Sequence, residues 1–322
     1  MPFAVTDACG RFAPSPTGAL HFGSLVAALG SCLEARSRGG RWLVRMEDVD
    51  QPRCRPGAAA RLLATLEACG FEWDGAVMLQ SARTARYREV FEQLKAAGAV
   101  YPCGCTRGEL AGVPNATPGI DGAPVYPGTC RGGLPPGKAA RAWRLRLSGD
   151  IEFDDAVQGP QRQNLPRDVG DCVLLRTDGL FAYQLAVVVD DADQGVDHVV
   201  RGADLIDSTP RQIYLQRLLG LPTPAYAHLP VAVDAAGHKL AKQTRAAPVD
   251  AAHPGPALFA ALRFLGQQPP AELRRGHAGG TPAERRRASA DFWAWARANW
   301  QLNKVPRVLT LPAQNFYPGD IS

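Results

Sequence analysis

Apolar residues follow two different periodicities along the first hundred residues of the chain. Across residues 23–39, apolar side chains recur at positions i, i+4, i+7 and i+8 and are followed by glycine, which predicts an amphipathic helix. A short apolar stretch at residues 41–48 predicts a strand, and residues 57–70 and 85–98 predict two more helices that end at glycine. Strands that alternate with helices favour an α/β fold with a parallel sheet.

The same alternation returns in the second half of the chain. Residues 180–195 are largely apolar, which we interpret as part of a sheet that is buried on both faces. Residues 208–220 begin with Ser208 as the expected N-cap and a proline in the first turn, a pattern typical of a helix start. Further strands are predicted at 141–147, 151–157 and 228–233, and further helices at 256–266 and 281–300.

A segment rich in cysteine, proline and glycine interrupts this pattern at residues 102–140. It has no sustained periodicity, and we interpret it as an inserted module that carries Cys103, Cys105 and Cys130. Zinc usually takes four cysteine or histidine ligands, so three clustered thiolates indicate a metal site. No histidine lies between residues 22 and 197, so the fourth ligand would be of another kind. The alternative is three reduced, metal-free cysteines in a loop.

Composition and charge narrow the functional classes only slightly. The chain has 322 residues, enough for roughly two domains, and its 46% hydrophobic and 21% charged residues are typical of a globular protein. Its net charge of +5 permits a nucleic-acid partner without requiring one. The N-terminal residues lack the pattern of a secretory signal, and no apolar stretch is long enough to span a bilayer. We therefore expect a cytoplasmic protein with no membrane partner, in which the cysteines stay reduced.

Two separated segments carry candidate chemistry. Residues 10–25 join a loop with two prolines and a glycine-bearing turn to a helix that begins near His21. The first amides of a helix have no intrahelical partner, so this helix start is suited to bind an anion. The segment "HKLAKQ", which follows the last predicted strand, carries Lys239 and Lys242. Each signal is weak alone, because such a histidine is more often a cap and such a lysine pair more often lies in a solvated loop.

Together and in this order, "HFGS" at 21–24 and "HKLAKQ" at 238–243 resemble the HIGH and KMSKS sequences of class I aminoacyl-tRNA synthetases. The segments "RFAPSPTGALHFG", "VRMEDVDQPR", "FAYQLAVVVDD" and "VRGADLIDSTPRQ" are similar to the glutamyl-tRNA synthetase family, and the resemblance covers about residues 10–245. It implies a Rossmann-like parallel sheet with a zinc-bearing insertion and a small C-terminal helical appendage. The expected divisions are 1–101 and 166–235 for the two halves of the catalytic domain, 102–165 for the inserted zinc-binding module, and 236–322 for the KMSKS-like loop and C-terminal helical region, without an anticodon-binding domain.

The resemblance implies that ATP, with Mg²⁺, lies against the helix that begins near His21. Activation is the attack of a carboxylate on the α-phosphate, so the enzyme positions two groups and neutralises the charge that develops. His21, Lys239 and Lys242 are the implied catalytic residues. Ser24 replaces the second histidine of HIGH and Ala241 replaces the serine of KMSKS, changes that we expect to slow activation without abolishing it. The implied ATP-binding residues are His21, Gly23, Ser24 and Lys242.

Free glutamate offers one ammonium and two carboxylates, so its site needs an anion and at least one cation with a planar fork. The resemblance implies that Glu47 holds the ammonium and that Arg11 supplies a fork. Which of Arg11 and Arg201 takes which carboxylate stays open. An alternative for Arg201 is a surface ion pair with Asp204. The implied glutamate-binding residues are Arg11, Phe12, Ala13, Pro14, Ser15, Glu47, Tyr183 and Arg201.

The cysteine spacing resembles the zinc site of synthetase-like proteins, in which a tyrosine four residues before the last cysteine completes the ligand set. In this sequence that tyrosine is Tyr126. The resemblance therefore implies one structural zinc per chain, held by Cys103, Cys105, Tyr126 and Cys130. Coordination would give a fold to an insert that has no apolar core of its own.

The sequence after the KMSKS-like loop is too short for the anticodon-binding part of a glutamyl-tRNA synthetase. The chain thus resembles the truncated paralogues of that family, in which ATP activates L-glutamate without tRNA. In that group the glutamate is transferred to queuosine in the anticodon loop of tRNA(Asp). Two alternatives stay open: a truncated glutamyl-tRNA synthetase that charges an acceptor end, and a non-catalytic RNA-binding paralogue. We expect a monomer whose partners are glutamate, ATP and tRNA(Asp).

Overall fold

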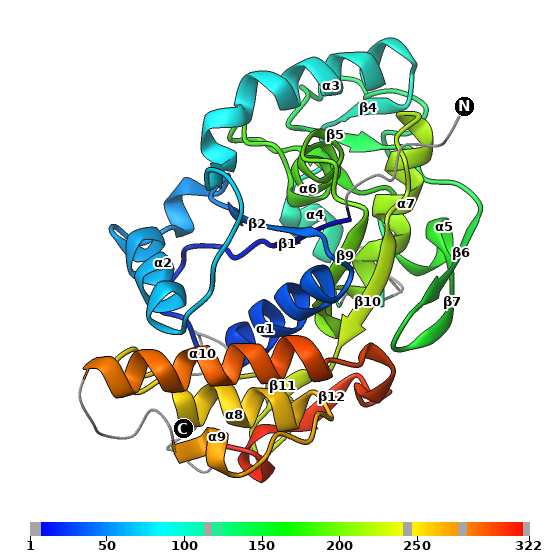
Figure 1. The fold of residues 1–322 in the computed structure, drawn as a ribbon. Coiled ribbons are helices and arrows are strands. Elements are labelled where there is room, and N and C mark those ends of the chain that lie inside the picture. The colour runs from blue at the N-terminus through cyan, green and yellow to red at the C-terminus, as the bar shows by residue number, and fades with distance from the viewer. Residues whose placement is uncertain are drawn as a thin grey trace, which may run out of the picture.

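A mostly parallel sheet crosses the centre of the molecule, with helices on both of its faces (Figure 1). The computed structural model describes residues 8–112, 118–120, 122, 124–240, 247–275 and 282–317. The strands are β1 (Cys9–Phe12), β2 (Arg41–Met46), β3 (Met78–Leu79), β4 (Val100–Cys103), β5 (Ala142–Leu145), β6 (Asp150–Asp155), β7 (Gly159–Asn164), β8 (Val173–Leu175), β9 (His198–Gly202), β10 (Ala225–Leu229), β11 (Val231–Val233) and β12 (Thr310–Pro312). The α-helices are α1 (Phe22–Ser37), α2 (Ala58–Ala68), α3 (Thr84–Ala96), α4 (Arg107–Ala111), α5 (Leu165–Asp168), α6 (Tyr183–Asp193), α7 (Thr209–Leu218), α8 (Gly255–Phe264), α9 (Glu272–Arg275) and α10 (Pro282–Asn299). None of the helices in these ranges has the length and apolar character needed to cross a membrane.

Two groups of parallel strands form the central layer. β2 lies between β1 and β3, and β10 lies between β9 and β6, in each case parallel to both neighbours. β7 closes one edge antiparallel to β6. β1 and β9 lie side by side, where the amide of Asp197 donates to the carbonyl of Cys9 at 3.1 Å. The α/β fold with a parallel sheet that the sequence predicts is confirmed.

Neighbouring residues of the central strands pack into different apolar cores. Val44 and Val200 pack with α1, α8 and α10 on one face, whereas Leu43 and Val199 pack with α3, α6 and α7 on the other. Successive residues of a strand point to opposite sides of the sheet, so a sheet covered on both faces needs apolar residues at consecutive positions. The helices predicted at 23–39, 57–70 and 85–98 are present as α1, α2 and α3 and supply part of this cover.

The prediction for residues 180–195 is wrong, because this segment contains helix α6 and not a buried strand. All residues from Leu185 to Asp191 are buried, so the helix is apolar around most of its surface and its periodicity is weak. The largely apolar composition of the segment favoured a strand buried on both faces. Periodicity alone cannot separate a buried strand from a buried helix, but length can: α6 has 11 residues, which is long for a strand.

Two smaller predictions also need correction. The single strand predicted at 228–233 is divided at Pro230, so that β10 pairs with β9 while β11 pairs with β12. Proline has no amide to donate to a strand ladder, which explains the break. Ser208 stands at the N-cap position of α7, but its side chain makes no capping hydrogen bond. Its hydroxyl accepts instead from Gln184 and Arg211.

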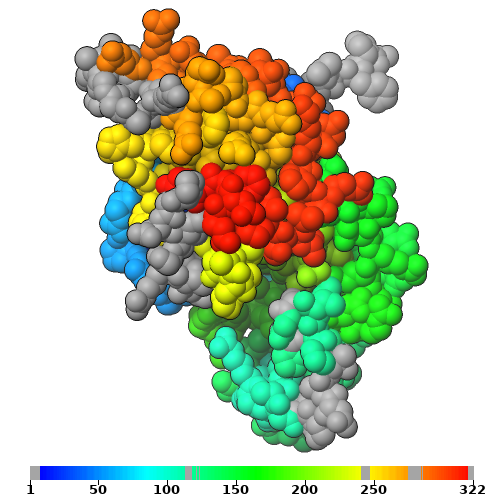
Figure 2. All heavy atoms as spheres, turned by 90° about the horizontal axis from the view of Figure 1, so that it is seen from below, coloured from blue at the N-terminus to red at the C-terminus, as the bar shows by residue number. Residues whose placement is uncertain are grey.

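A second, antiparallel sheet contains the beginning of the cysteine-rich segment. β4, which ends at Cys103, pairs with β5, and β5 pairs with β8. The strands predicted at 141–147 and 151–157 are both present but belong to different sheets, because β6 pairs with β10 in the central layer. In Figure 2 the blue-green residues that follow β4 lie at the lower end of the visible face, and the orange residues of the C-terminal part lie at its upper end.

Candidate active site

A cavity of about 780 Å³ opens beyond the carboxyl ends of β1, β2, β9 and β10. Open parallel sheets bind their ligands at this edge, outside the carboxyl ends of the strands. Of the residues predicted for glutamate and ATP, Lys242 lies outside the described part of the chain, as does the neighbouring Ala241. All the others line the cavity: Arg11, Phe12, Ala13, Pro14, Ser15, His21, Gly23, Ser24, Glu47, Tyr183, Arg201 and Lys239.

His21 is the N-cap of α1, the helix whose start faces the cavity. Its Nδ1 accepts from the amide of Ser24 at 3.3 Å, and its Nε2 lies 3.0 Å from the Ser24 hydroxyl. The residue that departs from the HIGH pattern therefore holds the His21 ring in place. A Cβ atom at Gly23 would lie 3.4 Å from two atoms of that ring and 3.5 Å from the carbonyl oxygen of Leu240, which are ordinary van der Waals contacts; glycine leaves this space at the helix start unfilled.

The segment that carries the KMSKS-like lysines is attached near both ends. The amide of Leu240 donates to a carbonyl of β11 at 2.9 Å, and the amide of Val249 donates to a carbonyl just before α1 at 2.9 Å. These bonds place Leu240 beside β11 and Val249 beside the start of α1. Lys239 forms an ion pair with Asp204 at 2.5 Å. Asp204 is thus engaged by this segment, and the alternative ion pair between Asp204 and Arg201 is not formed.

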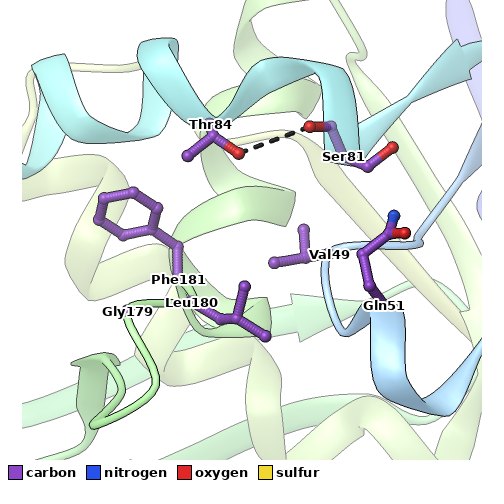
Figure 3. A pocket seen from close by; sticks show the side chains of 7 residues that line it. All are labelled: Val49, Gln51, Ser81, Thr84, Gly179, Leu180 and Phe181. Atoms are coloured by element: carbon purple, nitrogen blue, oxygen red, sulfur yellow. Dashed lines mark hydrogen bonds between the residues drawn. The ribbon is translucent and has the colours of Figure 1, made fainter.

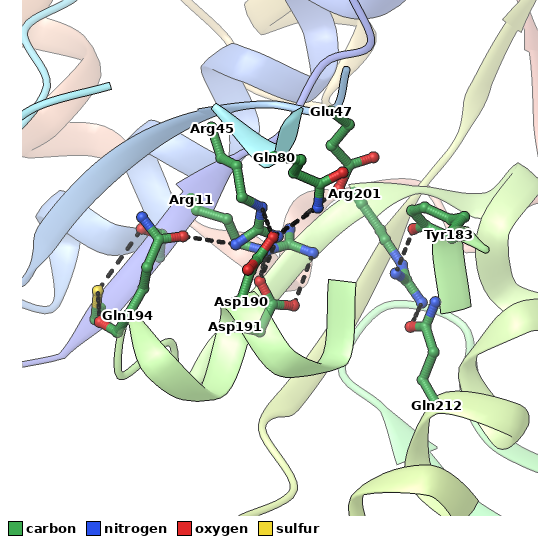
Figure 4. A network of polar contacts seen from close by, with 12 residues as sticks. Arg11, Arg45, Glu47, Gln80, Tyr183, Asp190, Asp191, Gln194, Arg201 and Gln212 are labelled. Carbon is green, nitrogen blue, oxygen red and sulfur yellow. Dashed lines mark hydrogen bonds and ion pairs between the residues drawn. The ribbon is translucent and has the colours of Figure 1, made fainter. Parts of the chain in front are cut away.

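Arg11, which lines the cavity, is held by Asp191 (Figure 4). Its Nε and Nη2 donate to the two oxygens of Asp191 at 3.0 and 3.3 Å. Arg45, whose side chain is fully buried, donates to the same carboxylate at 2.6 Å. Burial opposes ionisation of Asp191, but Arg11 and Arg45 hold its pKa below the usual value. One edge of the Arg11 guanidinium is therefore already occupied by a carboxylate of the protein.

Asp190 extends this network away from the cavity. Its Oδ2 accepts from Gln80 at 2.8 Å and from the hydroxyl of Tyr87 at 2.7 Å. Its Oδ1 accepts from Arg83 at 2.6 Å. Buried charges persist only where they are paired and hydrogen-bonded. These contacts fasten α6 to α3 and to the turn before it, and in this way they fix the position of Asp191.

Glu47 follows β2 and faces the same cavity. Its amide donates to the carbonyl of Pro14 at 2.9 Å, which ties the end of β2 to the loop after β1. Its carboxylate lies 3.8 Å from Nη2 of Arg45, and its side chain is 10% exposed. Burial raises the pKa of Glu47 to about 7, although Arg45 and Arg11 act in the opposite direction. A cationic ligand would favour the ionised form and lower this pKa.

Arg201 is buried at 6% exposure and has no carboxylate within ion-pair distance in the part of the chain that the structure describes. Its Nε donates to Nε2 of His228 at 3.1 Å, and its Nη1 donates to the hydroxyl of Tyr183 at 3.3 Å. Its Nη2 donates to Thr209 and Gln212, each at 2.8 Å. Burying a guanidinium that contacts only neutral groups costs free energy, and a ligand that supplies an anion would offset this cost. Its position in the cavity wall allows this.

A smaller hollow of about 340 Å³ adjoins the cavity (Figure 3). Val49 and Phe181 line both spaces, so the two are neighbours. The remaining lining residues are Gln51, Ser81, Thr84, Gly179 and Leu180. A ligand larger than an amino acid with a nucleotide would therefore find further room beside the cavity, between apolar walls and three polar side chains.

The three clustered cysteines lie together as the sequence predicts. The Sγ atoms of Cys103, Cys105 and Cys130 all lie within 4.8 Å of one another, a grouping that could hold a metal ion. The hydroxyl of Tyr126 lies 3.4 Å from Sγ of Cys103 and 3.7 Å from Sγ of Cys105. The guanidinium carbon of Arg144 lies 3.8 Å from the centre of the Tyr126 ring. Three sulfur donors beside a phenol oxygen suit a zinc-like ion in donor number and type.

Sequence analysis missed several buried polar residues that shape the cavity. Arg45 interrupts an otherwise apolar strand, and Asp190 and Asp191 end an apolar run. A charge inside a buried element needs a partner, so these positions could have been recognised as parts of a buried polar network. Asp155 and His228 carried no comparable signal. Their contact depends on the pairing of β6 with β10, which the sequence does not reveal.

The chain matches a family model described as "tRNA synthetases class I (E and Q), catalytic domain" over residues 8–272. Proteins named glutamyl-Q tRNA(Asp) synthetase are similar to it over most of its length. The protein from Aromatoleum aromaticum is 60% identical over 308 residues, which is 96% of this chain and 93% of that protein. The protein from Dechloromonas aromatica is 58% identical over 94% of this chain and 98% of its own length.

Among solved structures, the glutamate-tRNA synthetase from Elizabethkingia anophelis is similar to this chain with a TM-score of 0.72 and 24% sequence identity. The match covers 94% of this chain and 67% of that one. At this identity the likeness concerns the fold alone, and it places the described cavity in an architecture shared with that protein.

Proposed function

We propose, from the premise that this chain belongs to the family of class I tRNA synthetases of the E and Q type, that it activates L-glutamate with ATP and transfers it to queuosine in the anticodon loop of tRNA(Asp). The names of relatives that span nearly the whole chain support the acceptor. One observation supports glutamate as the amino-acid substrate. Arg201, a buried cation without a carboxylate partner in the described residues, lines the same cavity as Glu47. The enzyme would act as a cytosolic monomer, with residues 1–101 and 166–235 forming its catalytic domain.

The charges of the cavity match those of free glutamate. Glu47 would accept the α-ammonium, and ligand binding would draw this carboxylate into its ionised form. Arg201, with the hydroxyl of Tyr183 beside it, would bind one carboxylate. The Nε and Nη2 groups of Arg11 bind Asp191, so Arg11 would offer only its remaining donors to the substrate. Arg11 and Arg201 are positioned by hydrogen bonds to other side chains of the protein.

ATP would lie against the start of α1, where the first amides have no intrahelical partner. Gly23 would leave room for the nucleotide, and His21 and Ser24, which line the cavity, would stand beside the phosphates. A carboxylate oxygen of glutamate attacks the α-phosphorus, and the new O–P bond forms as the bond to pyrophosphate breaks. Lys239 and Lys242 would neutralise the charge that develops on the phosphates, with Mg²⁺ held mainly by ATP itself.

In the transfer step a hydroxyl of the queuosine cyclopentene diol attacks the acyl carbon of glutamyl-adenylate. The ester C–O bond forms, the bond to AMP breaks, and the hydroxyl proton passes to solvent or to the departing phosphate. The hollow that shares Val49 and Phe181 with the cavity would take part of the acceptor nucleoside. Unpaired loop bases can be splayed into such a space, as is usual in specific RNA recognition.

We further propose that one zinc ion per chain is bound by Cys103, Cys105, Cys130 and Tyr126. The proximity of the three thiol groups and the Tyr126 hydroxyl supports this ligand set. The amide of Cys130 donates to the Tyr126 hydroxyl at 2.9 Å, which holds the oxygen beside the sulfurs. The role of the ion would be structural, because it ties β4 to a segment with few apolar residues of its own.

Two assays test the proposed reaction. Glutamate-dependent exchange of pyrophosphate into ATP should proceed without any tRNA. Labelled glutamate should then be offered to queuosine-containing tRNA(Asp), to the same tRNA without queuosine, and to tRNA(Glu). We expect alkali-labile label on the first RNA only. Label on tRNA(Glu) that is lost after periodate oxidation of its 3′ end would show instead a truncated synthetase for acceptor ends, and no exchange at all would show a non-catalytic paralogue.

A further inference from the structure

A buried histidine–aspartate pair lies directly behind Arg201. Arg201 on β9 and His228 on β10 are register partners in two parallel strands. Asp155 ends β6, which pairs with β10 on its other side. His228 is fully buried, and Asp155 and Arg201 are 3% and 6% exposed. The three strands therefore bring an acid, an imidazole and a guanidinium into one row that ends at the cavity.

The hydrogen bonds along this row have a definite direction. Nδ1 of His228 lies 2.6 Å from Oδ2 of Asp155, and Nε of Arg201 donates to Nε2 of His228 at 3.1 Å. A guanidinium can only donate, so Nε2 must carry a lone pair. The proton of the neutral ring then resides on Nδ1 and is donated to Asp155. The other oxygen of Asp155 accepts from the amides of Val157, Gln158 and His228 at 2.8–3.1 Å, which fixes the carboxylate.

The order of these groups has an electrostatic consequence for Arg201. A carboxylate in direct contact would neutralise the guanidinium and compete with any anionic ligand. Here the negative charge of Asp155 is separated from Arg201 by a neutral ring. The cation is thereby oriented and partly stabilised, but its charge remains available on the cavity side.

We propose that Asp155 and His228 are positioning residues for substrate binding: Asp155 fixes the Nδ1–H tautomer of His228, and the unprotonated Nε2 holds Arg201 ready for a carboxylate of the substrate. This inference rests on the proposed function, since it takes that carboxylate to be one of glutamate. Neither residue needs to touch the substrate.

The electrostatics of the pair agree with this arrangement. Burial lowers the pKa of His228 to about 4 and outweighs the opposite effect of Asp155, while Arg201 lowers it further. The ring is thus neutral near pH 7. Burial opposes ionisation of Asp155, but the hydrogen bond from His228 and the backbone amides hold its pKa below the usual value. Tyr226 stacks on the ring of His228 at 6.1 Å, and Asp204 acts on it only at longer range.

The decisive variant is Asp155→Asn. The asparagine oxygen can keep the three backbone amides, while its NH₂ group would donate to Nδ1 and force the proton of His228 onto Nε2. Two donors would then face each other at Arg201. We expect the KM for glutamate in pyrophosphate exchange to rise about 10- to 100-fold, with kcat and the KM for ATP within about threefold of wild type. Asp250→Asn, in an exposed aspartate–histidine pair with His253, is the matched control and should change nothing.

A second pair of variants separates hydrogen bonding from packing. His228→Gln can donate to Asp155 and accept from Arg201, so it should keep the KM for glutamate within about fivefold of wild type. His228→Leu fills the space without an acceptor and should raise this KM about 10- to 100-fold. Equal effects of the two substitutions, or an Asp155→Asn protein with lowered stability and kcat but unchanged KM, would overturn the proposal.

Nitrogen NMR of the histidine-labelled wild-type protein tests the tautomer independently of activity. The chain has 6 histidines, and the resonances of His228 are identified by their loss in His228→Gln. We expect a protonated Nδ1 and an unprotonated Nε2. The opposite tautomer would refute the positioning mechanism even if exchange is normal. Wild-type protein with this tautomer but without glutamate-dependent exchange would instead refute the proposed function and, with it, the glutamate part of the inference.

Discussion

Glu47 gives the cavity a pH dependence whose sign follows from the structure. Its carboxyl is nearly buried, and burial raises its pKa from the ordinary 4.5 to about 7. If the ionised form binds the ammonium of glutamate, protonation of Glu47 competes with substrate binding. The KM for glutamate should therefore be nearly constant above pH 7 and rise about tenfold for each unit of pH below it.

The same pKa shift predicts a cost to the stability of the ligand-free protein. A carboxyl with a higher pKa in the folded than in the unfolded chain binds its proton more tightly when folded. Its contribution to stability is therefore greatest below about pH 4.5 and is lost as the pH rises through 7. The shift from 4.5 to about 7 corresponds to up to ~3 kcal/mol at pH 8. Glu47→Gln should remove this cost and stabilise the ligand-free protein increasingly over that range.

Two measurements on Glu47→Gln test both consequences. Its exchange activity should have a KM for glutamate at least ~30-fold above wild type at pH 8, because a buried charge partner is lost, and this KM should not vary between about pH 6 and 8. Urea unfolding without glutamate should show the growing difference in unfolding free energy. Glu152→Gln, at an exposed position of β6, is the matched control. A wild-type KM that is flat across this range, or an equal slope in Glu47→Gln, would refute the assignment of the ammonium to Glu47.

Three further outcomes are expected. Metal analysis should find one zinc per chain, and the double substitution Cys105→Ser and Cys130→Ser should abolish zinc binding. Wild-type protein without zinc, or a double variant with a full zinc content, would contradict the proposed zinc site. Lys242→Ala should lower the turnover of glutamyl-adenylate formation about 30- to 1000-fold while changing the KM for glutamate less than about threefold, whereas unchanged turnover would make Lys242 an ordinary loop residue. Glutamine should drive pyrophosphate exchange at least ~100-fold less well than glutamate, because its neutral amide replaces one of the two carboxylates that the cavity arginines would bind; equal exchange would show that the pocket does not select by charge.

Much of the fold could be predicted because its elements are marked locally. The helices near residues 23–39 and 85–98 have clear periodicity and end at glycine, and the structure contains both. The helix at Tyr183–Asp193 could not be recognised in the same way. It is buried around most of its surface, so it has no distinct polar face and its periodicity is weak. Pairing of strands was also inaccessible: nothing local indicates that residues 141–147 and 151–157 belong to different sheets.

The site was predictable only to the extent that its residues resemble a known pattern. Residues named from that resemblance, such as His21 and Glu47, line one cavity in the structure. The supporting groups were missed because their roles arise from contacts between distant segments. Arg11 meets Asp191 across 180 positions of sequence, and Asp155 meets His228 across 73. A single sequence gives the residue types but does not reveal which distant residues become neighbours in the fold.

The supporting contacts explain how the cavity can distinguish its two arginines. Arg11 and Arg201 are both buried and both line the cavity, so burial alone would make them equivalent. Arg11 is bound on one edge by Asp191, a direct carboxylate contact that satisfies its charge before any ligand arrives. Arg201 is bound by neutral acceptors, and Asp155 is separated from it by the ring of His228. Of these two arginines, Arg201 is therefore the one without a carboxylate partner among the described residues, and a ligand with a second carboxylate can supply it.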